Sequence, residues 1–389
     1  LLKTIRWREN MILFSILDAI FWGFFASFFG FITTYLLKCG LSNSTLSTVL
    51  AVYMACAFIG AFFWGGQCDK RNSNKKVFIP EFLLTIALAM FIFFMADKNV
   101  MVSACLYPVI GFLAVPLGSN LDSWMLKSFD QDMSIYGRAR GIGSAGYAIG
   151  ALLVGQLINR FGYMVIPVAS LITGGIVFVM VLFTKEKHFE KTLTHEIESG
   201  NPKELLRIPN YMYMVIILFL SGLAIAPYNN LKIIFLQNVG GDVGVLGIDS
   251  FIGVMIQAVF IFAAGSLKRM NRYFRLLVMT SCLCMTLTLA FFAVNPMMII
   301  MGSVCSNVSY GVMLPTTREI TEGNVPDTLK STAHALSDAM YGSFSGIIAL
   351  LYSGTLMDKF GIKAVPLLGI FIMFIPIAMS AIKMVKKAN

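Results

Sequence analysis

The sequence GQLINRFG occupies residues 155–162, and the related sequence GTLMDKFG occupies residues 354–361. The two segments are 199 residues apart, and the same offset relates Pro167 to Pro366 in the apolar stretch that follows each segment. Self-similarity at a long fixed offset is typical of a duplicated structural unit. The repeat therefore predicts two similar halves.

The composition indicates a membrane protein. The chain has 389 residues, of which 57% are hydrophobic and 13% are charged, and its mean hydropathy is +0.78. These values lie outside the range of soluble globular proteins. The net charge of +10 comes from short basic clusters between apolar segments, which is a topology signal and does not favour a nucleic-acid partner.

Twelve segments are long enough to cross a bilayer, for which a helix needs about 20 apolar residues. They lie near residues 11–37, 43–67, 77–96, 100–126, 140–160, 163–184, 211–237, 244–266, 275–294, 297–322, 331–356 and 361–383. We predict an all-α membrane protein with twelve transmembrane helices in two pseudo-symmetric six-helix bundles. The expected bundles are residues 1–184 and 211–389, joined by a cytoplasmic linker over residues 185–210.

The distribution of basic residues predicts the orientation. If both termini lie inside the cell, the internal loops and segment ends hold all but six of the 30 Lys and Arg residues. The six exceptions are Lys38, Lys98, Arg160, Lys232, Lys359 and Lys363. We therefore expect a multi-pass protein of the plasma membrane with cytoplasmic termini.

The sequence shows no pattern for catalysis or for a cofactor. The seven cysteines are scattered, mostly within apolar segments, and neither a zinc-type spacing nor a disulfide framework is present. A nucleotide-binding loop and a catalytic triad are also missing from the sequence. We expect no enzyme activity, no metal and no cofactor.

A carboxylate and a guanidinium interrupt the apolar sequence between residues 118 and 150. Asp122 lies near the end of the fourth segment, and Arg140 opens the fifth. A charge within the hydrocarbon costs about 2.5–3.5 kcal/mol, so such groups face a partner or a watery cavity. A carboxylate accepts hydrogen bonds from hydroxyl groups and a guanidinium donates several, so together they can orient a polyol. The alternative is that the pair only ties helix 4 to helix 5.

The loop after the second segment resembles the signature of the major facilitator superfamily of secondary transporters. Residues 65–76 read GGQCDKRNSNKK, with Asn72 where that family often has glycine. The resemblance implies a twelve-helix transporter in which Asp69 and Lys70 help to latch one conformation. The alternative for Asp69 and Lys70 is an ordinary solvated loop pair.

The sequence YGRAR at residues 136–140 resembles the branch of this superfamily that includes lactose permease. The resemblance implies that Asp122 and Arg140 bind sugar hydroxyls and that Tyr147 supplies the aromatic platform for the sugar ring. The second half departs from that branch. Asn229, Asn230 and Lys232 replace the helix 7 acids, and helix 8 offers Gln257.

This departure removes the branch's proton-handling acids, so a lactose-specific proton mechanism is not supported. We expect Asn229, Asn230 and Gln257 to help bind the substrate.

Other acids are candidates for proton coupling. Asp18 lies in the first segment, with Trp22 one turn later on the same face. A buried carboxyl group there can take up and release a proton, although a structural aspartate is the alternative. Glu319 and Asp338 are the further candidates. We expect Lys232 and Arg318 to neutralise them in salt bridges, which more often hold helices together than carry protons.

The sequence thus predicts a secondary transporter, with proton-coupled symport of a small polar solute such as a sugar or glycoside favoured. The alternatives are a proton-driven exporter of drugs or metabolites, an organic-anion transporter, and a membrane sensor or scaffold without transport. The expected partners are a small-molecule substrate, H⁺ and the lipid bilayer. We expect a monomer.

Overall fold

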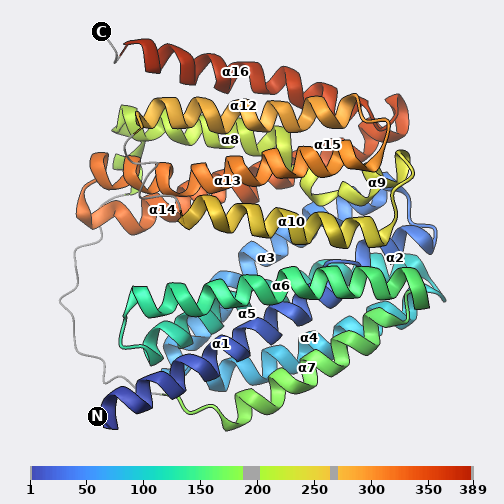
Figure 1. Cartoon of the computed structure of the whole chain (residues 1–389), viewed down its shortest axis with the longest axis vertical. Coiled ribbons are helices and arrows are strands. Elements are labelled where there is room, and N and C mark those ends of the chain that lie inside the picture. The colour runs from blue at the N-terminus through green and yellow to red at the C-terminus, as the bar shows by residue number, and fades with distance from the viewer. Residues whose placement is uncertain (1, 187–201, 263–269, 387–389) are drawn as a thin grey trace. The chain divides into compact units, whose positions relative to one another are not determined.

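A computed structural model describes residues 2–186, 202–262 and 270–386, and all the regular structure in these residues is helical (Figure 1). Twelve of the described helical segments are long and apolar enough to cross a membrane. The predicted linker over residues 185–210 lies mostly outside the described residues, as does the end of the predicted segment 244–266. The protein is therefore an all-α, multi-pass membrane protein.

The chain divides into two compact units. The first unit contains α1 (Leu2–Phe29), α2 (Ile32–Lys38), α3 (Asn43–Arg71), α4 (Lys75–Ala96), α5 (Val100–Ser128), α6 (Met133–Phe161), α7 (Val165–Phe183) and the first part of α10 (Val243–Phe262), up to Phe251. The second contains the rest of α10 with η1 (Pro202–Arg207), α8 (Pro209–Asn230), α9 (Lys232–Asn238), α12 (Arg272–Phe291), α13 (Pro296–Asn324), η2 (Asp327–Leu329), α14 (Lys330–Ala339), η3 (Met340–Phe344), α15 (Ser345–Phe360) and α16 (Ala364–Lys386).

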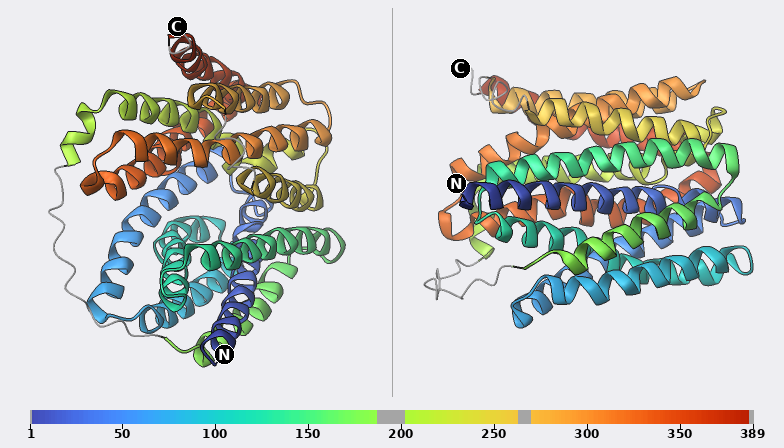
Figure 2. Two further views of the ribbon diagram at one scale, coloured as in Figure 1. Left: turned by 60° about the vertical axis from the view of Figure 1, so that its left-hand side comes forward. Right: turned by 60° about the horizontal axis from the view of Figure 1, so that its bottom comes forward.

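In the first unit, α1 and α6 run side by side (Figure 2). The glycines of α6 make this contact possible, because a Cβ atom on Gly146 would lie 2.2 Å from the carbonyl oxygen of Ala19. Lipid gives helices little hydrophobic drive to associate, so small residues that allow close backbone packing stabilise such pairs. This close contact brings the polar side chains of α1 next to those of α6.

The second unit has its own core. Tyr211 of α8 is fully buried with Leu276 and Met279 of α12 and Ile320 of α13. The Tyr211 hydroxyl donates a hydrogen bond of 2.7 Å to the carbonyl oxygen of Ala333 in α14. The phenol thus fixes the start of the eleventh spanning segment against α8.

The two units repeat the same local geometry. The first segment of each unit breaks before a short helix, at residues 30–31 between α1 and α2 and at Leu231 between α8 and α9. Gly162 and Gly361 follow α6 and α15 with φ values of +80° and +83°, which glycine adopts without strain. The repeat predicted from GQLINRFG and GTLMDKFG therefore marks equivalent helix ends.

The fifth helix begins earlier than predicted. It starts at Met133, so Arg140 lies about two turns inside α6 and does not open it. Arg138 and Arg140 interrupt the apolar pattern of the sequence. For this reason the predicted start of the helix was too late. The helix start is fixed instead by Asp132, whose Oδ1 accepts hydrogen bonds from the backbone N–H groups of Ser134 and Ile135 at 2.9 and 3.1 Å.

Candidate functional site

Asp122 and Arg140 meet within the first unit. The Nε atom of Arg140 on α6 lies 3.4 Å from Oδ1 of Asp122 on α5, and both side chains are 29% exposed. Asp122 lies six residues before the end of α5, and Arg140 lies seven residues after the start of α6. A partly exposed charge pair in spanning helices is expected to face water, since contact with lipid would be costly.

Arg140 also reaches a second carboxylate. Its Nη1 atom lies 3.8 Å from Oδ2 of Asp18 on α1, and the Asp18 side chain is only 1% exposed. The guanidinium carbon lies 4.4 Å from the ring centroid of Trp22, one turn along α1. One cation is therefore shared by two acids and lies on an aromatic face.

Gly143 makes room for Asp18. A Cβ atom at position 143 would lie 1.8 Å from Oδ2 of Asp18 and 3.1 Å from the Trp22 ring. The absence of a side chain one turn after Arg140 thus lets the carboxylate sit against α6. We call Asp18, Trp22, Asp122 and Arg140 the polar cluster of the first unit.

Several polar atoms of this cluster are buried without a hydrogen bond among the described residues. They are both carboxylate oxygens of Asp18, Oδ1 of Asp122, Nη1 of Arg140 and Nε1 of Trp22. Most buried polar groups in proteins have a partner, so an exception needs an explanation. These donors and acceptors are suited to hydroxyl groups, which donate and accept at once.

Aromatic residues extend the cluster. The Tyr136 hydroxyl, one turn before Arg140, lies beside Asp122. Tyr147, predicted as the platform for a sugar ring, lies two turns after Arg140 on α6 and is partly buried. The ring in contact with Arg140 is that of Trp22, which the sequence placed on the same face as Asp18 but not in the substrate site.

The predicted substrate residues of the second half belong to the second unit. Asn229 is exposed, and the Asn230 amide donates a 2.8 Å hydrogen bond to the Ala226 carbonyl of its own helix. Gln257 is partly buried on α10, and Nζ of Lys232 lies 5.5 Å from the Tyr228 ring centroid. The part of Asn229, Asn230 and Gln257 in binding remains a prediction; Lys232 was predicted for charge pairing and not for binding.

The predicted acids of the second half have arginine partners. Oδ2 of Asp338 accepts a 2.7 Å hydrogen bond from Arg318, one of the cations expected for this role. Oε2 of Glu319 lies 2.6 Å from Nη2 of Arg275, a fully buried side chain that the sequence did not single out. Arg275 follows a basic loop, where its charge was indistinguishable from a topology signal.

Asp69 and Lys70 are exposed on the last turns of α3. The residue that caps the end of α3 is Asn72, where the family often has glycine. Asn72 has φ +45° and ψ +38°, a left-handed conformation. Glycine adopts this conformation freely, and asparagine is among the few other residues that do so routinely. Asn72 therefore gives the chain the same backbone conformation that a glycine would give at this position. The role of Asp69 and Lys70 as a latch remains a prediction.

The fold and the polar cluster define a transporter-type membrane protein. Residues 12–368 match the sequence model of the family described as "MFS_1 like family". The chain belongs to this family, within the major facilitator superfamily of secondary transporters.

Relatives of known name are transporters. The chain is 23% identical to the maltose permease of Geobacillus stearothermophilus over 88% of this chain and 86% of that protein. It is 25% identical to the probable 3-phenylpropionic acid transporter of Escherichia coli K12 over 76% of this chain and 73% of that protein. The crystal structure of the nucleoside transporter NupG has the same fold, with a TM-score of 0.79 at 14% identity, over 97% of this chain and 98% of that one.

Proposed function

We propose that the protein takes up a neutral, hydroxyl-rich solute, such as a sugar or glycoside, together with a proton. In this proposal Asp122 accepts hydrogen bonds from substrate hydroxyls and Arg140 donates to them. Trp22 and Tyr147 supply apolar faces for the ring. The observation that carries the proposal is the sharing of Arg140 between Asp18 and Asp122.

Charge balance favours a neutral substrate. Arg140 has two carboxylates within 4 Å, while Arg275 and Arg318 are each paired with an acid. An organic anion would have to displace one of these carboxylates, which leaves a partly buried acid without its partner. The likeness to a maltose permease points the same way, whereas the likeness to a 3-phenylpropionic acid transporter supports the organic-anion alternative.

Asp18 is the proposed proton carrier. With both acids ionised, Asp18, Asp122 and Arg140 together carry one negative charge. A proton on Asp18 neutralises this group and weakens the hold of Asp18 on Arg140, so the guanidinium can turn toward Asp122 and the substrate. Proton binding and substrate binding then favour each other, and the coupling is reciprocal. A neutral cluster is also cheaper to keep in a spanning segment.

Glu319 and Asp338 were the other proton candidates. Since Arg275 and Arg318 contact them within 3 Å, we assign the proton to Asp18 alone. The transport cycle would alternate access by movement of one bundle, residues 1–184, against the other, residues 211–389. We propose a monomer in the plasma membrane with both termini in the cytoplasm, and Asp69 and Lys70 as latch residues between conformations.

A thermal-shift experiment on the purified protein tests the substrate class, because a ligand that binds the native state raises the melting temperature. The probes are maltose, D-xylose, uridine and 3-phenylpropionate. We expect a sugar to stabilise the wild type and to have no effect on Asp122→Asn. Stabilisation by 3-phenylpropionate alone would contradict the sugar assignment and favour the organic-anion alternative. A response confined to lipophilic cations, added as a control set, would favour a drug exporter.

A further inference from the structure

Glu81 of α4 is a buried acid that the proposed function does not use. It is the seventh residue of the helix, and its side chain is 0% exposed. Neither of its carboxylate oxygens has a hydrogen-bond partner among the described residues. An isolated buried charge is very costly, so buried acids are either paired or neutralised. Glu81 therefore needs a cation or a proton.

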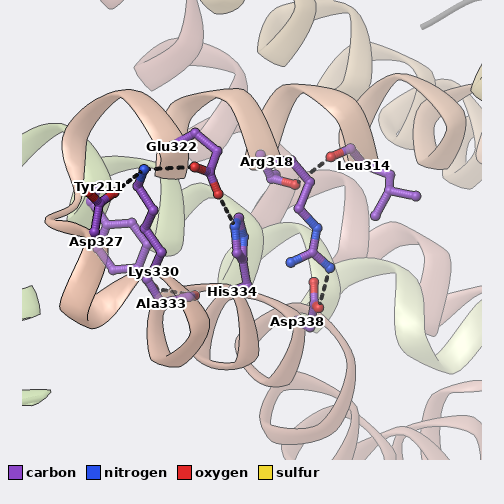
Figure 3. A network of polar contacts seen from close by, with 10 residues as sticks. Tyr211, Leu314, Arg318, Glu322, Asp327, Lys330, Ala333, His334 and Asp338 are labelled. Atoms are coloured by element: carbon purple, nitrogen blue, oxygen red, sulfur yellow. Dashed lines mark hydrogen bonds and ion pairs between the residues drawn. The ribbon is translucent and has the colours of Figure 1, made fainter. Parts of the chain in front are cut away.

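Acids elsewhere in the spanning segments have cations beside them. In the second unit, Lys330 contacts Glu322 at 2.9 Å and Arg318 contacts Asp338 at 2.7 Å (Figure 3). The part of the chain that the structure describes offers Glu81 no such contact. The difference lies in the surroundings of α4.

Apolar groups cover much of α4 near Glu81. Helix α1 packs on α4 with Phe21 and Phe24, whose ring centroids lie 6.3 and 5.2 Å from that of Phe82. The acid of α1, Asp18, belongs to the polar cluster with α6. Helix α7, which also packs on α4, has no charged residue. A proton is the partner that these surroundings leave for Glu81.

Polar groups near Glu81 form a network at the start of α4. Asn120 of α5 lies beside Glu81 but outside hydrogen-bonding geometry, and its Oδ1 accepts a 2.9 Å hydrogen bond from the Asn74 amide. Oδ1 of Asn74 accepts a 2.7 Å hydrogen bond from Nζ of Lys127 on α5. Cys68, near the end of α3, interacts electrostatically with Glu81. Asn74 thus holds both donors that an ionised Glu81 would attract.

The same network ties α4 to the chain that leaves α7. The Ser73 hydroxyl and the backbone N–H of Asn74 donate hydrogen bonds to Glu186. In return, Nζ of Lys75 donates a 2.9 Å hydrogen bond to the carbonyl oxygen of Thr184. The start of α4 is therefore held on α5 and on the segment after α7 by groups that meet at Asn74.

We infer that Glu81 is a second proton-binding site of the first unit, and that loss of its proton opens this network. The bound proton acts as a pH sensor and is distinct from the transported proton assigned to Asp18, so the inference does not depend on the substrate. An ionised Glu81 attracts the amide of Asn120 and the ammonium of Lys127, and both groups must leave Asn74 to reach it. The start of α4 then loses its hold on α5.

Infrared spectroscopy of the purified full-length protein at pH 7 tests the bound proton, because a protonated carboxyl group has a C=O band that a carboxylate lacks. Glu81→Gln should lose one such band relative to the wild type. The control Glu322→Gln removes an ion-paired acid and should lose none. Glutamine resembles the protonated acid in shape, so Glu81→Gln should melt no lower than the wild type. An unchanged carboxyl band, or a Glu81→Gln protein that is destabilised or does not fold, would overturn the inference.

The reaction of Cys68 with a maleimide tests the opening of the network, in a variant in which the other six cysteines are replaced by serine. Cys68 is 7% exposed, and its labelling should speed up with pH in any case because the thiolate is the reactive form. The ratio of the labelling rates with Glu81 and with Glu81→Gln removes this common effect. The ratio should be close to one at pH 6 and at least three at pH 9. A ratio that does not rise above one by pH 9 would overturn the inference.

Discussion

The Asp18 carboxylate fills the space that a side chain on Gly143 would need, because a Cβ atom there would lie 1.8 Å from Oδ2. Gly143→Ala should therefore displace Asp18 from Arg140 and destabilise the fold by about 1–3 kcal/mol, as overpacking does. Substrate-dependent transport should fall at least tenfold. Gly141→Ala is the matched control, since a Cβ atom at position 141 would meet no described atom of another helix within 4 Å. Equal activity in the two variants would contradict this role of Gly143.

Removing only Glu319 from its pair with Arg275 should destabilise the protein more than removing both charges. Glu319→Gln leaves the fully buried Arg275 guanidinium without its charged partner. Breaking a buried pair is costly, but Glu319 is 36% exposed, so we expect a loss of about 2 kcal/mol. Adding Arg275→Met should restore most of the thermal stability. If the double variant melts below Glu319→Gln, the buried charge is not the source of the cost.

Because Asn72 has a left-handed backbone conformation, glycine should be tolerated at this position better than alanine. Asn72→Gly should be neutral or slightly stabilising, because glycine adopts φ +45° without strain. Asn72→Ala should cost about 1 kcal/mol. Thermal unfolding of the two variants in the same detergent measures the difference. A variant with alanine that is as stable as the one with glycine would show that the turn has relaxed.

Asp242 should make part of the stability of the first unit sensitive to acid. Burial acts to raise the pKa of this carboxyl group, but hydrogen bonds from the backbone of Val245 and the amide of Asn159 outweigh burial and hold the pKa below its ordinary value of 3.8. A lowered folded-state pKa stabilises the fold above pH 3.8, and this contribution is lost as the pH falls through the folded-state value. Melting temperatures of Asp242→Asn should accordingly depend less on pH below about 4 than those of the wild type.

Much of the fold could be predicted from the sequence, because long apolar segments and a fixed repeat leave few alternatives for a membrane protein. Helix boundaries were less accurate where charges lie inside a span. Arg140 was expected at the start of the fifth helix, whereas the cap at Asp132 starts the helix seven residues earlier. A hydropathy pattern cannot distinguish a charge at a helix end from a charge inside a helix that faces a polar partner.

The polar cluster was only partly predictable. The sequence singled out Asp122 and Arg140 on consecutive helices but left open whether they touch, and the structure places their side chains 3.4 Å apart. The approach of Asp18 to Arg140 depends on the packing of α1 against Gly143 and Gly146, which the sequence analysis did not predict. The ring of Trp22 was missed for the same reason, since its contact with Arg140 is set by the packing of α1 on α6.

The measurement that tests proton-coupled binding most directly is the maltose affinity of the wild type and Asp18→Asn across the range from pH 5 to pH 8. If Asp18 and the substrate compete for Arg140, wild-type affinity should decrease as the proton leaves Asp18, while Asp18→Asn should bind maltose with one affinity throughout. Parallel pH dependence in the two proteins would contradict Asp18 as the proton carrier and would place the coupling group elsewhere.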